Sequence, residues 1–157
     1  MGFEQFILDR GERLLRAAWL LTGDRQHAED LLQTALVKCW SKYDGDDDRF
    51  EGYVRTTLHR TYISWWRRRS WHEQPIEHMP DRSDADARVE VRLDLARALR
   101  TLSRPQRAAI TLRYFDDLTV QQVAKTLGMP EGTVKAHLHR GIQVLRKSGL
   151  VEEEELA

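Results

Sequence analysis

Apolar residues recur at intervals of three and four along nearly the whole chain, and one acidic stretch interrupts them. Such spacing lines one face of an α-helix, and no segment shows the alternation of a half-buried strand. The pattern predicts helices over about residues 3–22 and 50–70, with a third between them that Asp24 caps. Further helices follow the acidic stretch. We therefore expect an all-α protein.

The interruption spans residues 72–88, where two prolines and five acidic residues replace the helical pattern. This composition is typical of a flexible linker. It divides the chain into two helical domains, 1–71 and 89–151, each close to the smallest size that sustains its own core. Residues 152–157 form an acidic tail, which we interpret as a solubilising end. The alternative is a tail that folds back on basic surfaces of the same chain.

Charge is unevenly distributed, although 25 basic and 25 acidic residues leave the chain neutral. Between Arg49 and Trp71 there are six arginines and one acidic residue, Glu51. A basic segment in a neutral chain indicates an anionic partner. The run of acids from Asp46 to Asp48 is predicted to lie in a loop.

Several classes of protein are excluded by the sequence. A lone Cys39 rules out a disulfide framework and a cysteine-rich zinc site. The six histidines show no metal-ligand spacing, and no catalytic triad or phosphate-binding glycine loop is present. We expect no enzymatic activity, no metal and no cofactor. The longest apolar run, Ala17 to Leu21, is too short for membrane insertion, and no signal peptide is visible, so we expect a cytoplasmic protein.

Residues 119–145 have the pattern of a helix-turn-helix. Thr119 caps the first helix, Gly128 supplies the turn, and Pro130 starts the second helix. Apolar residues of the second helix face inward, which leaves an outer face that fits a DNA major groove. That face carries Lys135, Ala136, His139 and Arg140. The alternative is an ordinary helical hairpin with a solvated basic face.

A second basic element lies at the end of the helix over residues 50–70, where Trp65, Trp66 and Trp71 alternate with three arginines. Unpaired bases stack on aromatic rings, and arginine neutralises the phosphates beside them. Each tryptophan taken singly is more readily a core residue. The cluster as a whole favours a nucleic-acid surface.

Three segments in this order, residues 28–40, 50–69 and 118–145, resemble those of an extracytoplasmic-function sigma factor of the sigma-70 family, in an actinobacterial branch. The resemblance implies a region 2-like domain over 1–71 and a region 4-like domain over 89–151. It implies a transcription initiation factor that binds the β′ clamp and β flap of bacterial core RNA polymerase. It also implies that promoter DNA is bound, with the −35 element read as duplex and the −10 element opened and captured. An anti-sigma factor is a further expected partner.

The resemblance assigns roles to individual residues. The polymerase interface falls on one helical stripe: Asp30, Gln33, Thr34 and Val37. The −35 element falls to Thr133, Lys135, Ala136, His137, His139 and Arg140. The −10 element and its single strand fall to Arg60, Ser64, Trp65, Trp66, Arg67 and Arg68, with the loop over 43–49 helping to hold a flipped base. Arg60 stands where the family usually has asparagine, which leaves the preferred −10 base open.

Two other functions are compatible with the helical pattern. A helix-turn-helix repressor would act without polymerase and would bind a palindromic duplex as a dimer. A helical protein-interaction adaptor would show little affinity for nucleic acid and no strong salt dependence. The tryptophan–arginine cluster and the separate N-terminal domain argue against the repressor.

Overall fold

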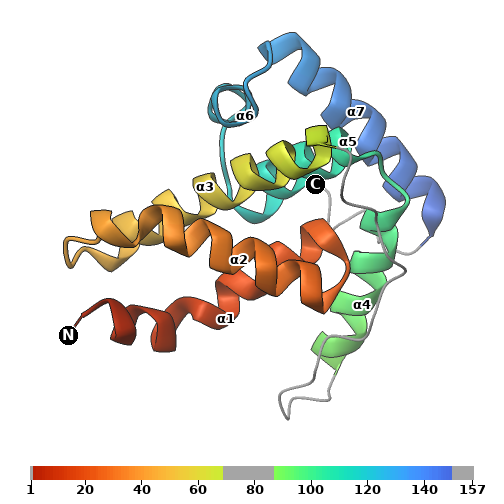
Figure 1. The fold of residues 1–157 in the computed structure, drawn as a ribbon. Helices are drawn as coiled ribbons and strands as arrows, with labels where there is room; N and C mark the ends of the chain where they lie inside the picture. The colour runs from red at the N-terminus through yellow and green to blue at the C-terminus, as the bar shows by residue number, and fades with distance from the viewer. Residues whose placement is uncertain (1, 69–86, 150–157) are drawn as a thin grey trace. The chain divides into compact units, whose positions relative to one another are not determined.

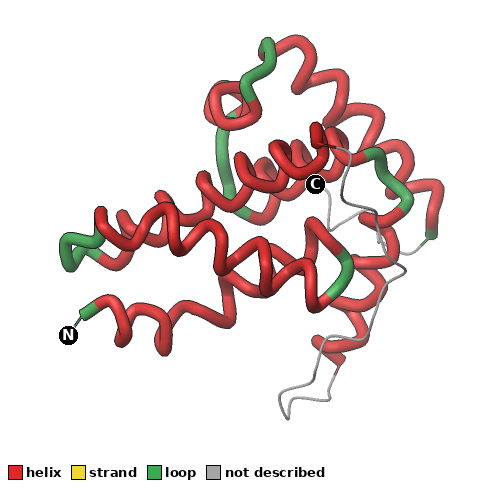
Figure 2. Tube along the Cα trace, viewed as in Figure 1, coloured by secondary structure: helices red, strands yellow, loops and turns green. Residues whose placement is uncertain are grey.

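The computed structural model describes residues 2–68 and 87–149, and the side chains of residues 87–93 are outside that description. Within these residues every regular element is helical, as Figure 2 shows, which confirms the all-α prediction. The chain divides into two compact units, residues 1–73 and 74–157, which are described separately. Residues 72–86 of the predicted linker and the tail over 152–157 lie outside the described residues, and the predicted domain limits stay a prediction. No helix of the described residues is long and apolar enough to cross a membrane.

The first unit consists of α1 (Phe3–Thr22), α2 (Arg25–Cys39), the short 3-10 turn η1 (Trp40–Lys42) and α3 (Asp47–Arg68). Helices α1 and α2 run side by side, and α3 packs against both (Figure 1). The core is made of apolar side chains from all three helices, among them Leu14, Leu31 and Leu58. The sequence predicted the extent of α1 and the cap of α2 correctly. Gly23 turns the chain at a φ of 72°, and the Asp24 carboxylate accepts a hydrogen bond from the His27 amide at 3.1 Å.

The start of α3 differs from the prediction. Asp46 caps the helix, because its carboxylate accepts a hydrogen bond from the Arg49 amide at 3.2 Å. Asp47 and Asp48 then form the first turn of α3 rather than part of a loop. Acidic side chains are favourable there because they lie close to the positive end of the helix dipole. The acids that we expected in a loop therefore begin the helix.

Four aromatic rings close one end of this unit. Phe3 and Phe6 of α1 meet Phe50 of α3 and Tyr43 of the connecting loop, with 4.8 Å between the ring centres of Phe6 and Phe50. The Tyr43 ring lies 5.1 Å from that of Phe50, edge to face. Its hydroxyl donates to Asp47 at 2.7 Å. Tyr43 thus attaches the loop that precedes α3 both to the core, through Phe50, and to the first turn of α3, through Asp47.

The second unit contains α4 (Ala87–Arg100), α5 (Arg104–Ile110), the π-helical turn η2 (Thr111–Phe115), α6 (Val120–Leu127) and α7 (Glu131–Ser148). Helix α7 contacts α4, α5 and α6. Ser103 and Thr119 form complete capping boxes with Gln106 and Gln122, and Thr119 is the cap that the sequence predicted for the first helix of the helix-turn-helix. Gly128 ends α6 at a φ of 68°, and Pro130 is the residue immediately before α7. The predicted helix-turn-helix is confirmed as α6 and α7.

Two features of this unit were not predicted. Arg107 is completely buried, and its guanidinium donates to the carbonyl oxygens of Leu99 and Leu102 at 2.9 and 3.0 Å. These carbonyls lie at the end of α4 and just beyond it, where a helix leaves acceptors without a partner in its own backbone. The second feature is η2, which leads into Asp117 at a φ of 55°. The sequence gives no signal that Arg107 is buried or that the helix after Ile110 becomes a π-helical turn.

Candidate functional site

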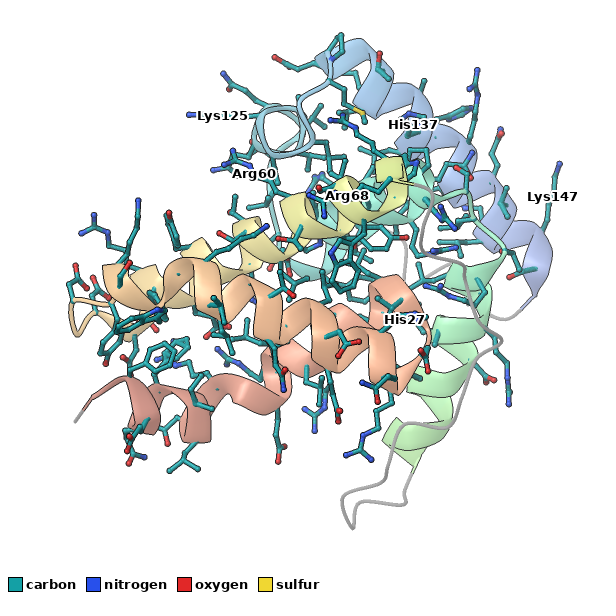
Figure 3. All side chains as sticks on the ribbon, in the orientation of Figure 1. His27, Arg60, Arg68, Lys125, His137 and Lys147 are labelled. Carbon is teal, nitrogen blue, oxygen red and sulfur yellow. The ribbon has the colours of Figure 1, made fainter. Side chains whose placement is uncertain are left out.

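The outer face of α3 carries a continuous stripe of exposed or half-exposed side chains. Tyr53, Thr56, Arg60, Ser64 and Arg67 follow one another at steps of three and four residues, so they share one side of the helix. Figure 3 shows Arg60 and Arg68 on this helix. Val54, Leu58 and Tyr62 on the opposite side are buried. The burial of the apolar side therefore directs the predicted −10 residues Arg60, Ser64 and Arg67 outward together.

The two tryptophans of the predicted −10 set do not share this stripe. Trp65 and Trp66 follow Ser64 directly, which turns them by about 100° and 200° around the helix from it. Both are half-buried, and the Trp66 ring lies 6.3 Å from that of the fully buried Tyr62. The structure thus separates Arg67, on the stripe, from the two rings, whereas Arg68 lies one turn after Trp65. Trp71 and Arg69 lie outside the described residues.

An open hollow lies at the first turns of α3. It has a volume of about 390 Å³ and is lined by Lys42, Asp44, Arg49, Phe50, Gly52, Tyr53 and Thr56. The Tyr53 ring is 42% exposed, and the Lys42 ammonium lies 5.4 Å from its centre. Arg49 and Asp44 form an ion pair at 3.5 Å. The hollow adjoins the α3 stripe, because Tyr53 and Thr56 belong to both. Sequence reasoning pointed to the loop but missed Lys42, Tyr53 and Thr56.

Helix α2 presents the predicted polymerase stripe to the outside. Asp30, Gln33 and Val37 are exposed and Thr34 is half-exposed, with Val37 at 71%. Trp40 continues this stripe one turn further and is 60% exposed, which sequence reasoning did not include. Large apolar side chains exposed side by side among polar ones indicate a protein interface. The step of three residues from Val37 to Trp40 was the signal in the sequence that Trp40 continues the stripe.

The outer face of α7 holds most of the predicted −35 residues. Thr133, Lys135, His139 and Arg140 are exposed and Ala136 is partly so. Val134, Leu138 and Leu145 are buried on the opposite side. Figure 3 shows Lys147 projecting away from α7 and Lys125 projecting away from α6. The basic side chains of the helix-turn-helix thus reach solvent.

His137 is placed differently from its neighbours. It lies on the side of α7 that also carries the buried Val134 and Gly141, and it is half-buried. Its Nδ1 is buried with no hydrogen-bond partner among the described residues. Burial, and then the charge of Arg140, lower the pKa of the imidazole below its ordinary 6.5. A half-buried ring beside the core is poorly placed to read a base, so the predicted −35 role of His137 is the one that its placement favours least.

A network of ion pairs in the first unit joins α1 to the start of α3. Glu51 is 6% exposed and accepts from Arg10 at 3.0 Å, from Arg13, and from Arg55 at 3.1 Å. Burial opposes ionisation of Glu51, but hydrogen bonds from Arg13, Arg10 and Arg55 outweigh it and lower its pKa below 4.5. This network holds α3 in place behind the outer stripe. No group of three metal-ligating side chains exists among the described residues.

The comparisons with known proteins cover both units. Sigma-70 region 2 matches residues 7–72, and sigma-70 region 4 matches residues 92–145. The RNA polymerase sigma-E factor of Streptomyces avermitilis is 38% identical over 94% of this chain and 84% of its own. The ECF RNA polymerase sigma factor SigL of Mycobacterium tuberculosis is 34% identical over 85% of this chain and 80% of its own. The chain belongs to the sigma-70 family, in its extracytoplasmic-function branch.

A solved structure has the same fold. The sigma factor RpoE of Bartonella quintana, in complex with the anti-sigma factor NepR, matches 96% of this chain and 98% of its own with a TM-score of 0.70 at 24% identity. Sigma factors are transcription initiation factors without enzymatic activity, and they bind core RNA polymerase and promoter DNA. This sigma factor is therefore a polymerase-binding protein that selects promoters.

Proposed function

We propose that this sigma factor reads its promoter with two separate surfaces, the outer face of α7 for the −35 duplex and the outer stripe of α3 for the opened −10 element. The exposed cations on both helices, each opposite a buried apolar side, carry the proposal. A helix in the major groove reads base edges with its outward side chains. Arg140 is the proposed guanine or backbone contact, with Thr133, Lys135, Ala136 and His139 around it.

The −10 element meets Arg60, Ser64 and Arg67 on the α3 stripe, with Arg68 beside them. Extrusion of a base from the duplex costs a few kcal/mol of stacking, which a pocket and phosphate contacts must offset. The hollow at Tyr53 adjoins this stripe and offers an aromatic ring, a hydroxyl and charged groups. It is the proposed place for one extruded base. Trp65 and Trp66 then hold the end of α3 rather than stacking on bases.

The outer face of α2 is the proposed surface for the β′ clamp of polymerase. Asp30, Gln33, Thr34 and Val37 form it, and Trp40 extends it. The β flap then falls to the second unit, for which no single residue is assigned. An anti-sigma partner for this chain stays a prediction, since the Bartonella quintana structure contributes only its fold at 24% identity.

A reconstituted transcription assay tests the proposal. Purified protein is added to core RNA polymerase lacking any sigma factor, with a pool of genomic promoters as template. Defined transcripts are expected only with this protein. Arg60→Ala should relax selection in the −10 element, and Arg140→Ala should relax it in the −35 element.

His137→Leu is the matched control on α7 and should leave promoter selection unchanged, because His137 lies beside the core. No transcripts and no co-migration with core polymerase would refute the proposal. The repressor would then be favoured if the protein still bound duplex DNA as a dimer. The adaptor would be favoured if it bound no DNA.

A further inference from the structure

Two lysines on one side of α2 and η1 direct their ammonium groups to α3. The Lys38 Nζ donates to the Thr61 hydroxyl at 3.2 Å, and the Lys42 Nζ lies 5.4 Å from the centre of the Tyr53 ring. The two lysines are four residues apart, about 6 Å along the helix axis. Because α2 and α3 run in opposite directions, Lys38 meets the later part of α3 and Lys42 meets its start. Lys42 therefore reaches Tyr53 of the α3 stripe, and Lys38 reaches the buried Thr61, which directly follows Arg60 of the stripe.

The cations of the first unit fall into two groups. Among its described residues, every arginine of α1 and the arginine that begins α2 are paired with a carboxylate, as are Arg49 and Arg55. Lys38 and Lys42 form no ion pair with any described carboxylate, and the same holds for Arg60, Arg67 and Arg68. All five unpaired cations lie on the α3 stripe, beside it or facing it. Apart from Arg49, which lies one turn before Tyr53 and is paired with Asp44, the paired arginines lie off the α3 stripe. A line of cations without carboxylate partners along one helix face fits a polyanion.

We propose that Lys38 and Lys42 bind successive phosphates of the single-stranded −10 segment along the boundary between α2 and α3. The inference rests on the proposed function, because it assigns the strand that α3 opens to a particular path. Arg60 and Arg67 contact the strand from the other side, and Tyr53 offers its ring to a base next to Lys42. Helix α2 then contacts polymerase with one side and DNA with another.

The alternative assigns Lys38 to polymerase, since it follows Val37 directly. Lys38 lies about 100° around the helix from Val37 but one turn after Thr34, so its position on α2 places it at the edge of the polymerase stripe and does not decide between the two roles. The hydrogen bond to Thr61 of α3 holds the ammonium on the α3 side. Lys42 contacts a ring on α3 in the same way. Both lysines are therefore oriented toward α3.

The salt dependence of DNA binding by the holoenzyme tests this inference. The probe is a fork-junction DNA built from a promoter that the transcription assay recovers, duplex upstream and single-stranded through the −10 element. Each phosphate contact on a single strand contributes about 0.7 to the slope of log Kobs against log salt. We expect Lys38→Gln and Lys42→Gln each to reduce the slope by about 0.7, and the double variant by about 1.4.

Arg25→Gln is the matched control, because it removes one positive charge from the same helix, where Arg25 is paired with Glu29 at 2.8 Å. It should leave the slope unchanged. Affinity for core polymerase is measured in parallel and should be the same for all variants. An unchanged slope in the double variant, with wild-type holoenzyme binding the probe, overturns the inference alone. So does a loss of core affinity in Lys38→Gln without a change in slope. A wild-type holoenzyme that does not bind the probe overturns the proposed function as well.

Discussion

A single buried carboxylate, Glu51, connects two helices of the first unit. It is carried by α3 and accepts from Arg10 and Arg13 of α1 and from Arg55 of its own helix. Arg10 also pairs with the exposed Asp48, at 2.7 Å. In the sequence Glu51 is only the one acid in a basic segment. Its role depends on α1 and α3 meeting, which no local pattern encodes.

We predict that Glu51→Gln destabilises the first unit by about 2 kcal/mol at neutral pH, because Arg10, Arg13 and Arg55 lose the buried carboxylate that they contact. The pKa of Glu51 is below 4.5 in the folded protein, so the unfolded state binds its proton first as the pH falls. The stabilisation is therefore complete above the unfolded pKa and is lost as the pH falls through the folded one. The difference between wild type and variant should shrink in acid.

Urea unfolding followed by tryptophan fluorescence measures this difference, because all five tryptophans lie within residues 1–73. Glu12→Gln is the control, since Glu12 is 45% exposed and pairs with Arg16 at 3.6 Å on the surface of α1. It should cost less than about 0.5 kcal/mol. Equal destabilisation by the two variants, or a Glu51→Gln effect that persists in acid, would contradict the role given to Glu51.

Individual residues also show where the candidate site departs from its prediction. Helical spacing placed Lys135, Ala136, His139 and Arg140 on the outer face of α7, and all but the half-exposed Ala136 are exposed. His137 entered the −35 set through the resemblance, and it is half-buried at the border of the buried side of α7. Only packing shows on which side of that border a residue falls. The same reason places Trp65 and Trp66 off the stripe of Arg60, Ser64 and Arg67.

At the scale of elements, the second unit depends on the close approach of α5 and α7. A Cβ atom on Gly141 would lie 3.0 Å from the Ile110 Cγ1 and 3.3 Å from its Cδ1. Glycine in a helix interior costs about 1 kcal/mol relative to alanine. Its presence on the buried side of α7 is explained by this contact. The helix-turn-helix is held against α5 by it.

We predict that Gly141→Val destabilises the second unit by about 1–3 kcal/mol, because the added methyl groups overpack the contact with Ile110. Truncation of the facing side chain in Gly141→Val/Ile110→Ala should recover part of the loss, since the two sites are coupled. Hydrogen exchange of the α7 amides, read by mass spectrometry, reports the change. Gly132→Ala is the control. Nothing lies within 4 Å of a Cβ there, so slower or unchanged exchange is expected.

If exchange in Gly141→Val were unchanged, Ile110 would have room to move and the close approach would not limit the packing.

The capping boxes at Ser103 and Thr119 were, by contrast, predictable from the sequence. They are formed by residues three apart, so they need no partner from elsewhere in the chain.

For the whole molecule, the two surfaces that we propose for DNA belong to different units. The α3 stripe lies in residues 1–73 and the α7 face in residues 74–157. Each unit has its own buried core, with Leu58 in one and Leu145 in the other. Promoter selection by both surfaces then requires that polymerase hold the two units at a set separation on the DNA.

We predict that inserting about five base pairs between the −35 and −10 elements abolishes transcription, because half a helical turn moves one element to the other side of the duplex. Run-off transcription with a promoter recovered for this protein measures the effect. Base changes in the spacer at constant length are the control and should leave transcription nearly unchanged. Full activity with the insertion would mean that the two surfaces do not act on one promoter together.

The sequence by itself determined the features that depend on neighbours in the chain. These are the helical class, the cap at Asp24, the helix-turn-helix and the outward stripes on α2 and α7, all of which depend on residues close together in the chain. The α3 stripe was predicted only in part, because Tyr53 and Thr56 were missed and Trp65 and Trp66 were included. Tertiary structure alone decided the Glu51 network, the buried Arg107, the hollow at Tyr53, and the orientation of Lys38 and Lys42 toward α3. Each of these joins groups from separate helices or turns. Their contact depends on how the helices pack, and side-chain periodicity within one helix carries no information about the partner across the interface.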